Sequence, residues 1–158
     1  MTRTPEEEPA TVESAGPRRP VVEGRTMLEL LAPRECWELL AGQPLGRLAF
    51  LLDDEPCILP VNYAVFDGTV VFRTAGGSKL AAVATYPSVA FEVDGHDADR
   101  RTGWSVLLVG RPQEVRDPAT IRALEALGLE PWPVGAKLHW VRLTPHRVTG
   151  RRLLPRTA

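Results

Sequence analysis

The sequence predicts a β-rich α+β fold, in which six to seven mainly antiparallel strands form a closed or partly closed barrel with about three short helices. Short apolar runs recur from residue 46 onward, and turn-forming residues separate them. The turns between the first three runs are too short for a crossover helix, so these strands pair antiparallel as a meander. Helical spacing with a recognisable start or stop signal is confined to three short stretches.

The chain of 158 residues is long enough for one domain. Residues 1–25 contain four prolines, the acidic run Glu6-Glu7-Glu8 and few large apolar side chains. Such a segment buries too little surface to offset the entropy that is lost on ordering. We therefore expect a disordered N-terminal tail over residues 1–25 and a folded domain over residues 26–158.

Composition narrows the function classes. The net charge of −1 provides no general attraction to nucleic acid or to an anionic membrane. Residues 1–25 lack the apolar core of a secretory signal, and no run of about 18 apolar residues could span a membrane. The two cysteines and three histidines match no metal-ligand spacing. The sequence therefore predicts a cytoplasmic protein with reduced thiols and no metal centre.

The elements of the first half follow from local signals. After a lead-in strand over residues 27–31, Pro33 suits the first position of a helix that Gly42 ends, and Cys36 packs among its leucines. Asp67-Gly68 is a strong signal for a two-residue hairpin turn. Pro60 lacks an N–H donor, so it implies a sheet edge, a bulge or a break in pairing. The strands of the meander are expected over residues 46–52, 57–63 and 69–74.

In the second half, Pro87 ends a helix over residues 79–86, and Asp117 is a suitable N-cap for a helix over residues 118–127. A polar loop is expected over residues 94–102. The remaining strands are expected over residues 89–93, 103–115, 138–143 and, as a seventh, 147–153, with an irregular loop over residues 129–135.

The turn after the third strand of the meander gathers groups that suit an anion. Residues 70–80 read VVFRTAGGSKL, and their two glycines let backbone N–H groups approach a ligand closely. Ser78 is a candidate N-cap, and a helix N-terminus favours phosphate. Arg73 and Lys79 would add charge-assisted hydrogen bonds of roughly 1.5–3 kcal/mol each. An ordinary turn with two solvated cations explains the same residues, because the stretch matches no P-loop and no dinucleotide fingerprint.

A series of five motifs then points to a family. In chain order they are PVNY (60–63), VVFRT (70–74), GSKL (77–80), VAFEVD (89–94) and GWSVLLVG (103–110). The series resembles the pyridoxamine 5′-phosphate oxidase-like flavoproteins over roughly residues 28–153. The resemblance implies the FMN-binding split β-barrel fold and a homodimer with FMN at the subunit interface. It also implies an oxidoreductase that acts on a small molecule, with flavin carrying the hydride chemistry.

The resemblance also implies cofactor contacts at nine positions. They are Pro60, Val61, Asn62, Arg73, Thr74, Ser78, Lys79, Trp104 and Ser105. The first three would run beside the flavin ring through backbone groups, the next four would hold the phosphate, and the last two would lie near the same cofactor. Asn62 suits a turn equally well, and Trp104 is more often packed in a core or an interface. Residues that could close the pocket from the partner subunit are Trp132, His139 and Trp140; no catalytic residue is identified.

The chain departs from the true oxidase at two places. Its turn AGGSK is shorter, and residues 149–153 read TGRRL where the oxidase has an Arg-Leu-His-Asp-Arg stretch for its substrate. The pattern is closer to the actinobacterial branch, and the substrate machinery of vitamin B6 metabolism is not visible. Two alternatives stay open: a deazaflavin-dependent reductase on the same fold, and a flavin-binding or stress-related module without turnover. Cations for a deazaflavin tail could come from Arg100, Arg101, Arg151 and Arg152.

Overall fold

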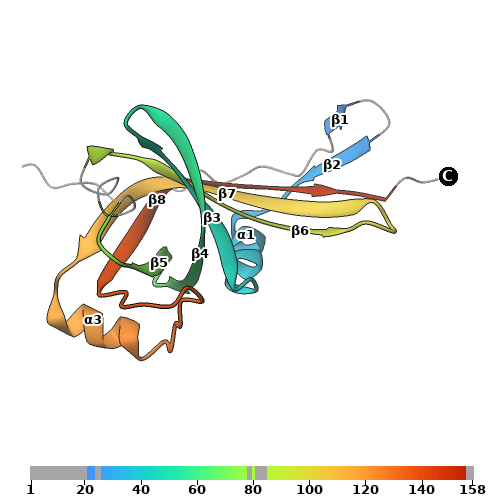
Figure 1. Cartoon of the computed structure of the whole chain (residues 1–158). Helices are drawn as coiled ribbons and strands as arrows, with labels where there is room; N and C mark the ends of the chain where they lie inside the picture. The colour runs from blue at the N-terminus through green and yellow to red at the C-terminus, as the bar shows by residue number, and fades with distance from the viewer. Residues whose placement is uncertain (1–20, 24–25, 78–79, 81–84, 156–158) are drawn as a thin grey trace, which may run out of the picture.

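The computed structural model describes residues 21–23, 26–77, 80 and 85–155. Eight strands and two helices lie within these residues (Figure 1). In chain order they are β1 (Val21–Glu23), β2 (Thr26–Leu30), α1 (Pro33–Ala41), β3 (Leu45–Leu52), β4 (Glu55–Phe66), β5 (Thr69–Thr74), β6 (Val89–Asp97), β7 (Thr102–Val115), α3 (Pro118–Glu125) and β8 (His139–Leu153).

Strands β3 to β8 close into a barrel. The order in the sheet is β1-β2-β8-β5-β4-β3-β6-β7, and β7 also pairs with β8, which joins the two ends of a six-stranded ring. Each recorded pairing is antiparallel. The predicted β-rich fold with a mainly antiparallel barrel is therefore confirmed.

Three strands continue beyond the barrel as an arm, which extends to the right in Figure 1. We define the arm as residues 93–97 of β6, 102–106 of β7 and 150–153 of β8. In the arm β7 is the middle strand, because it pairs with β6 on one side and with β8 on the other. Strand β2 lines the outer edge of β8.

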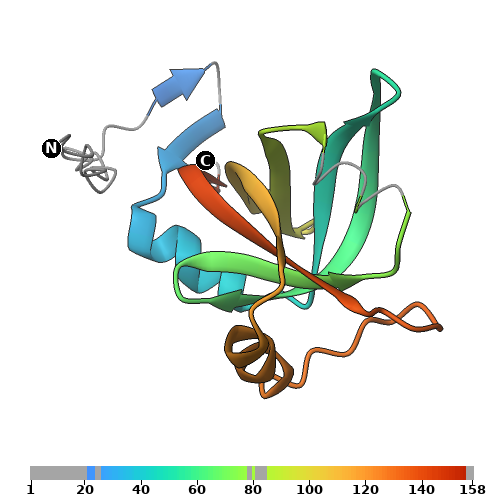
Figure 2. The same cartoon turned by 90° about the vertical axis from the view of Figure 1, so that its left-hand side faces the viewer.

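The barrel wall is covered on both faces where β5 and β8 pair. Alternate residues of these two strands point inward and join the main core together with α1. Val71 and Trp140 point the other way and pack against Leu124 of α3. Figure 2 shows α3 on the outside of the barrel. Consequently five of the six residues of β5 are buried, and only Arg73 is partly exposed.

Helix α1 is tied to the barrel by a buried hydrogen bond. Cys36 and Leu40 are 1% and 0% exposed and belong to the main core, which confirms that Cys36 packs with apolar neighbours. The Tyr63 hydroxyl donates to the Leu40 carbonyl in the last turn of α1. Burial raises the pKa of Tyr63 well above its usual range, so this hydroxyl stays a donor at neutral pH.

Tyr63→Phe is expected to lower the free energy of unfolding by about 1–3 kcal/mol, because a buried carbonyl loses its donor while the ring stays in place. Denaturant unfolding measures the change. Tyr86→Phe is the matched control, since the described chain offers its hydroxyl no hydrogen-bond partner, and it is expected to change stability by less than about 0.5 kcal/mol. Equal losses in both variants would contradict the role of the Leu40 contact.

The β4–β5 connection confirms the Asp67-Gly68 turn. Phe66 pairs with Thr69, so the loop between them has two residues. Asp67 and Gly68 have φ angles of 48° and 65°. Positive φ at both central residues is the type I′ geometry that matches the twist of the flanking strands. Residues 53–54, with φ angles of 50° and 63°, turn β3 into β4 in the same way.

The two strands expected over residues 138–143 and 147–153 are one strand, β8, so that prediction is wrong at Pro145. In the described sheet, pairing with β5 ends at Leu143 and pairing with β2 begins at Arg151. Pro145 therefore sits on a stretch of β8 with one free edge, where its missing N–H is tolerated. On its other side it faces Gly110, at a register shift of β7.

The prediction of a loop over residues 94–102 is also wrong. Strand β6 continues to Asp97 and β7 begins at Thr102, which leaves only a tight turn over residues 98–101. Several side chains of this part of the arm are exposed, so the alternation that marks a strand is weak in its sequence. Residues 21–23, expected to be disordered, form β1 and pair with β2. The rest of the expected tail, and most of the helix expected over residues 79–86, lie outside the described residues.

Neither described helix has the length and apolarity that crossing a lipid bilayer requires. Within the described residues, no three side chains of His, Cys, Asp or Glu gather as they would around a metal ion.

Candidate functional site

The barrel wall opens between β4 and β5. In the described sheet their pairing ends at Tyr63 and Phe72. Beyond that point residues 60–62 pair with β3 alone, and Arg73 and Thr74 pair with β8 alone. Here the two strands separate, and each leaves one edge unpaired. The backbone N–H and C=O groups on these edges make no hydrogen bonds within the sheet. The segment expected beside a flavin ring and the segment expected at a phosphate lie on these two edges, so the structure brings them close together.

Arg73 and Thr74 point to opposite faces of β5. The Arg73 Nε donates to the Lys137 carbonyl at 3.1 Å, and its guanidinium lies 5.4 Å from the centre of the Trp140 ring. Thr74 faces the barrel interior, is 6% exposed and donates from Oγ1 to the Ala75 carbonyl at 2.9 Å. The two side chains that were expected to hold one phosphate therefore point to opposite sides of the barrel wall.

The turn after Thr74 is described only in part. Gly77 has a φ of 123°, a conformation that favours glycine, and an added Cβ would meet no atom within 4 Å. Ser78 and Lys79, the other two residues expected at the phosphate, lie outside the described residues.

Asn62 connects three parts of the chain. Its Nδ2 donates to the Pro44 carbonyl at 3.1 Å, and its Oδ1 accepts the Trp132 backbone N–H at 2.8 Å. The side chain is 6% exposed. These two hydrogen bonds use one donor and one acceptor of the amide and fix the orientation of the side chain. The loop that carries Trp132 is thereby held against the ring segment of β4.

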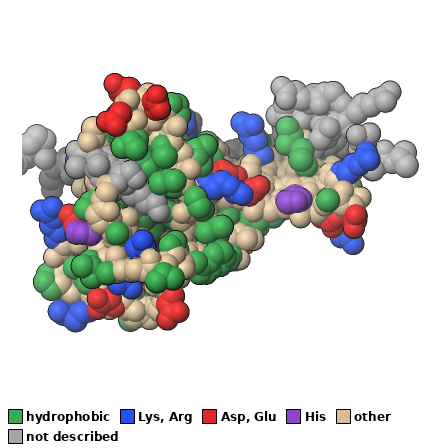
Figure 3. All heavy atoms as spheres, in the orientation of Figure 1, with side chains coloured by type: hydrophobic (Ala, Val, Ile, Leu, Met, Phe, Trp, Pro, Cys, Tyr) green, Lys and Arg blue, Asp and Glu red, His purple; other side chains and the backbone are tan. Residues whose placement is uncertain are grey.

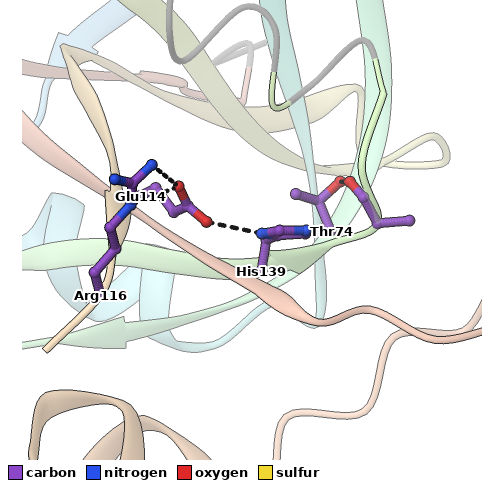
Figure 4. Close-up of polar contacts among 5 residues, drawn as sticks. Thr74, Glu114, Arg116 and His139 are labelled. Carbon is purple, nitrogen blue, oxygen red and sulfur yellow. Dashed lines mark hydrogen bonds and ion pairs between the residues drawn. The ribbon is translucent and has the colours of Figure 1, made fainter. Parts of the chain in front are cut away.

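A row of polar side chains crosses the open end of the barrel (Figure 4). His139 of β8 is the register partner of Thr74. Its Nδ1 lies 2.7 Å from Oε1 of Glu114 on β7, and Oε2 of Glu114 accepts from Arg116 at 2.8 and 3.0 Å. Figure 4 shows the His139 ring between Glu114 and Thr74. One ring nitrogen of His139 thus contacts the Glu114 carboxylate, and the ring lies next to the end of β5 that carries Thr74.

Glu114 remains ionised in this row. Hydrogen bonds from His139 and then from Arg116 lower the pKa of the Glu114 carboxyl below its usual value. A carboxylate in contact with Nδ1 fixes the orientation of the imidazole and favours a proton on that nitrogen. Sequence reasoning had His139 as a candidate but missed Glu114 and Arg116. Only the register between β7 and β8 reveals the contact, and no local pattern encodes it.

A hollow lies beside this row. Its volume is about 680 Å³, and Glu114 and Arg116 form part of its wall. The other described lining residues come from the end of β7 and from the segment that leads into β6: Leu80, Thr85, Tyr86, Pro87, Arg111, Pro112 and Gln113.

Trp104 and Ser105 lie on the arm, away from the opening. Ser105 pairs with Arg151 on β8, whereas Arg73 pairs with Trp140 on the same strand. The two positions are about 36 Å apart along β8 at the rise of an extended strand. Hollows of about 230 and 630 Å³ flank the Trp104 side chain. One chain therefore does not bring Trp104 to the opening between β4 and β5.

The two tryptophans that were expected to close the pocket from the partner subunit lie in different surroundings. Trp140 is 3% exposed and belongs to the cluster under α3, where it contacts the Arg73 guanidinium. Trp132 is 66% exposed on the loop that Asn62 holds. Both tryptophans thus neighbour the opening, one as packing and the other as an exposed ring.

The closed antiparallel ring with an opening between two strand ends defines a split-barrel protein. Residues 32–152 match the family model described as pyridoxamine 5′-phosphate oxidase, and the chain belongs to this family. The family resemblance of the five motifs and the split-barrel fold are therefore confirmed.

Known proteins extend this comparison. The protein Rv0080 of Mycobacterium tuberculosis is 36% identical over 146 residues, which cover 89% of this chain and 95% of that protein. The structure of the FAD-binding protein of Mycobacterium smegmatis is 42% identical, with a TM-score of 0.69, and covers 82% of this chain and 99% of its own. An FAD-binding protein of Mesorhizobium loti is 25% identical with a TM-score of 0.69, and the match covers 82% of this chain and 98% of that one.

Proposed function

We propose that this chain binds a flavin nucleotide at a site shared by two copies of the chain, and that it acts as a flavin-dependent oxidoreductase. The observation that carries the proposal is the 42% identity, over 82% of this chain, to a split-barrel protein of Mycobacterium smegmatis that binds FAD. The opening between β4 and β5 supports it, because unused backbone groups and a cation meet there.

The residues at the opening fit the two ends of such a ligand. Arg73 makes no ion pair within the described chain, so its charge is available to a phosphate. Lys79 and Ser78 follow in the same turn of the sequence. The backbone of residues 60–62 offers N–H and C=O groups to the polar edge of a flavin ring. The flavin would supply hydride transfer, while these residues bind and orient it.

A second copy of the chain would complete the site. Trp104 and Ser105 are separated from Arg73 by most of β8, so within one chain they cannot close over a ligand at the opening. Apolar side chains remain uncovered near the opening and on the neighbouring β4, among them Ile58, Trp132 and Leu138 at 65%, 66% and 77% exposure. Figure 3 shows hydrophobic side chains gathered over the barrel on the visible face. Such a surface suits a partner.

Arg73→Ala is expected to weaken FMN binding by roughly 10- to 100-fold, the loss of one charge-assisted hydrogen bond of about 1.5–3 kcal/mol. Riboflavin, which lacks the phosphate, should bind equally well to both proteins. Arg34→Ala is the matched control, because Arg34 is 91% exposed on α1. Fluorescence titration of the purified protein measures the affinities. A protein that is colourless when purified and ignores added flavin would contradict the proposal.

Mixing two variants tests whether the site is shared. Arg73→Ala and Trp104→Ala chains, each weak in binding alone, are co-expressed with different tags and purified as a mixed dimer. If Arg73 of one copy and Trp104 of the other serve the same ligand, one of the two sites in the mixed dimer carries both native residues. It should recover native affinity at one flavin per dimer. No recovery would place both residues in separate or single-chain sites.

Two of the four arginines considered for a deazaflavin tail make ion pairs within the described residues. Arg152 makes ion pairs with Glu29 and Glu35 at 3.3 and 2.6 Å, and Arg100 lies 3.7 Å from Asp97. Because Arg152 already has two carboxylate partners, we favour a flavin with its phosphate at β5 over a cofactor whose tail depends on Arg152. Reduction of the bound flavin by a nicotinamide donor, followed by reoxidation by an organic acceptor, would separate an enzyme from a module without turnover.

A further inference from the structure

We propose that residues 132–137 form a strap across the opening between β4 and β5, and that this strap controls how fast the flavin enters and leaves. The inference rests on the proposed flavin site and deepens it, because it assigns the exchange of the ligand to a defined segment of the chain.

One end of the strap is tied to the edge of β4. The Trp132 backbone N–H donates to Oδ1 of Asn62 at 2.8 Å. Val61 and Tyr63 point into the main core, so Asn62 between them points to the outer face of the barrel. Its Nδ2 donates to the Pro44 carbonyl, which holds the amide in place. The strap therefore begins on the outer face of the segment expected beside the flavin ring.

The other end of the strap is tied to the edge of β5. The Lys137 carbonyl accepts from Nε of Arg73 at 3.1 Å. Arg73 pairs with Trp140, and its guanidinium lies over that ring, on the outer face that α3 covers. Figure 2 shows the chain between α3 and β8 outside the barrel. A flavin that reaches from residues 60–62 to Arg73 therefore lies along the two edges that the strap joins.

The length of the strap limits how far the two edges can separate. Trp132 and Lys137 are five residues apart, and a fully extended chain of this length spans at most about 18 Å. The edges can move further apart only if one of the two hydrogen bonds breaks. A flavin ring that enters from the outer face must also displace the strap, so entry requires the release of one end.

The strap is built to open. It is held at each end through a main-chain group, and the side chains of Trp132 and Val134 are 66% and 100% exposed. A segment with few buried apolar contacts opens locally at a low cost in free energy. Transient release of the strap therefore needs no unfolding of the barrel.

Arg73 can hold the strap and the phosphate at the same time. A guanidinium has five N–H donors, and the bond to Lys137 uses the one on Nε. The strap can thus keep both attachments with the flavin bound. Because a segment with equal contacts in the free and the bound state shifts no equilibrium, the strap should set the rates of exchange and not the affinity.

Trp132→Pro and Trp132→Ala form a matched pair that tests this role. Both variants lack the indole, but only proline removes the N–H that Asn62 accepts. Relative to Trp132→Ala, we expect Trp132→Pro to raise both the association and the dissociation rate of FMN about 3- to 10-fold, the effect of losing one hydrogen bond, while the dissociation constant stays within about twofold. Stopped-flow fluorescence measures both rates, and thermal unfolding verifies that the variants fold.

Two further measurements isolate the strap. Asn62→Ala removes the acceptor instead of the donor and should accelerate FMN exchange in both directions, as Trp132→Pro does. Riboflavin, which lacks the phosphate, should show the same acceleration in Trp132→Pro, because the strap acts on passage through the opening and not on the phosphate contact.

The outcomes separate this inference from the proposed function. Equal exchange rates in Trp132→Pro and Trp132→Ala would show that the strap does not control entry. A faster dissociation with an unchanged association rate would show that the strap contacts the bound flavin instead. Either result would overturn the inference and leave the flavin site intact, whereas a native protein that binds no flavin would remove both.

Discussion

Phe91→Ala is expected to lower the free energy of unfolding by about 3–5 kcal/mol, the usual cost of removing a fully buried aromatic ring. Phe91 of β6 is 0% exposed, and its ring meets Tyr63 edge-on with 4.8 Å between the ring centres. The substitution would leave a cavity next to Tyr63, which directly follows residues 60–62 on β4. Denaturant unfolding measures the loss, and flavin affinity should fall with it.

Gly46 makes this prediction sharper. A Cβ at Gly46 would lie 2.2 Å from Cζ of Phe91, so β3 accommodates the ring only because residue 46 has no side chain. Gly46→Ala alone is expected to cost about 1–3 kcal/mol through overpacking. In the Phe91→Ala background the added methyl enters the cavity, so that its cost should vanish. A double-mutant cycle with additive losses would show that the two positions do not compete for the same space.

Asn62→Ala is expected to cost about 2–4 kcal/mol, because the Pro44 carbonyl and the Trp132 N–H both lose their partner. The loop with Trp132 would also lose its attachment to β4. Limited proteolysis should then cut within residues 129–138, where the native protein resists.

Trp132→Ala is the matched control for Asn62→Ala. The hydrogen bond to Asn62 comes from the backbone N–H of Trp132, and the indole is 66% exposed. This variant should therefore leave the loop attached to β4 and lose much less stability than Asn62→Ala. A loss as large as that of Asn62→Ala would mean that the indole, not the amide, holds the loop.

Local sequence signals predicted the parts of the fold that local chemistry determines. The Asp67-Gly68 turn, the Asp117 cap and the Pro33 helix start all occur as expected, and Asp117 accepts the Thr120 N–H at 2.7 Å. The continuity of β8 through Pro145 could not be predicted. Pro145 is tolerated because β8 has an unpaired edge between the residues that pair with β5 and those that pair with β2.

In the candidate site, too, local sequence predicted some features and missed those that depend on how the strands pair. The motif series located both edges of the opening, at residues 60–62 and at Arg73 and Thr74, because those residues are contiguous in sequence. It did not reveal that Arg73 and Thr74 face opposite ways, nor that Glu114 meets His139. Both facts depend on which side of a strand faces the barrel interior and on register across the sheet.

Strand β8 also determines the order in which the protein can be assembled on the ribosome. It pairs with β2, β5 and β7, and all three are translated before it. Until residues 139–153 leave the exit tunnel, these strands have no partner at that side, and the ring stays open. Contacts of such long sequence separation form slowly, and exposed strand edges invite association between nascent chains. Chaperone dependence during synthesis should therefore decline abruptly once β8 emerges.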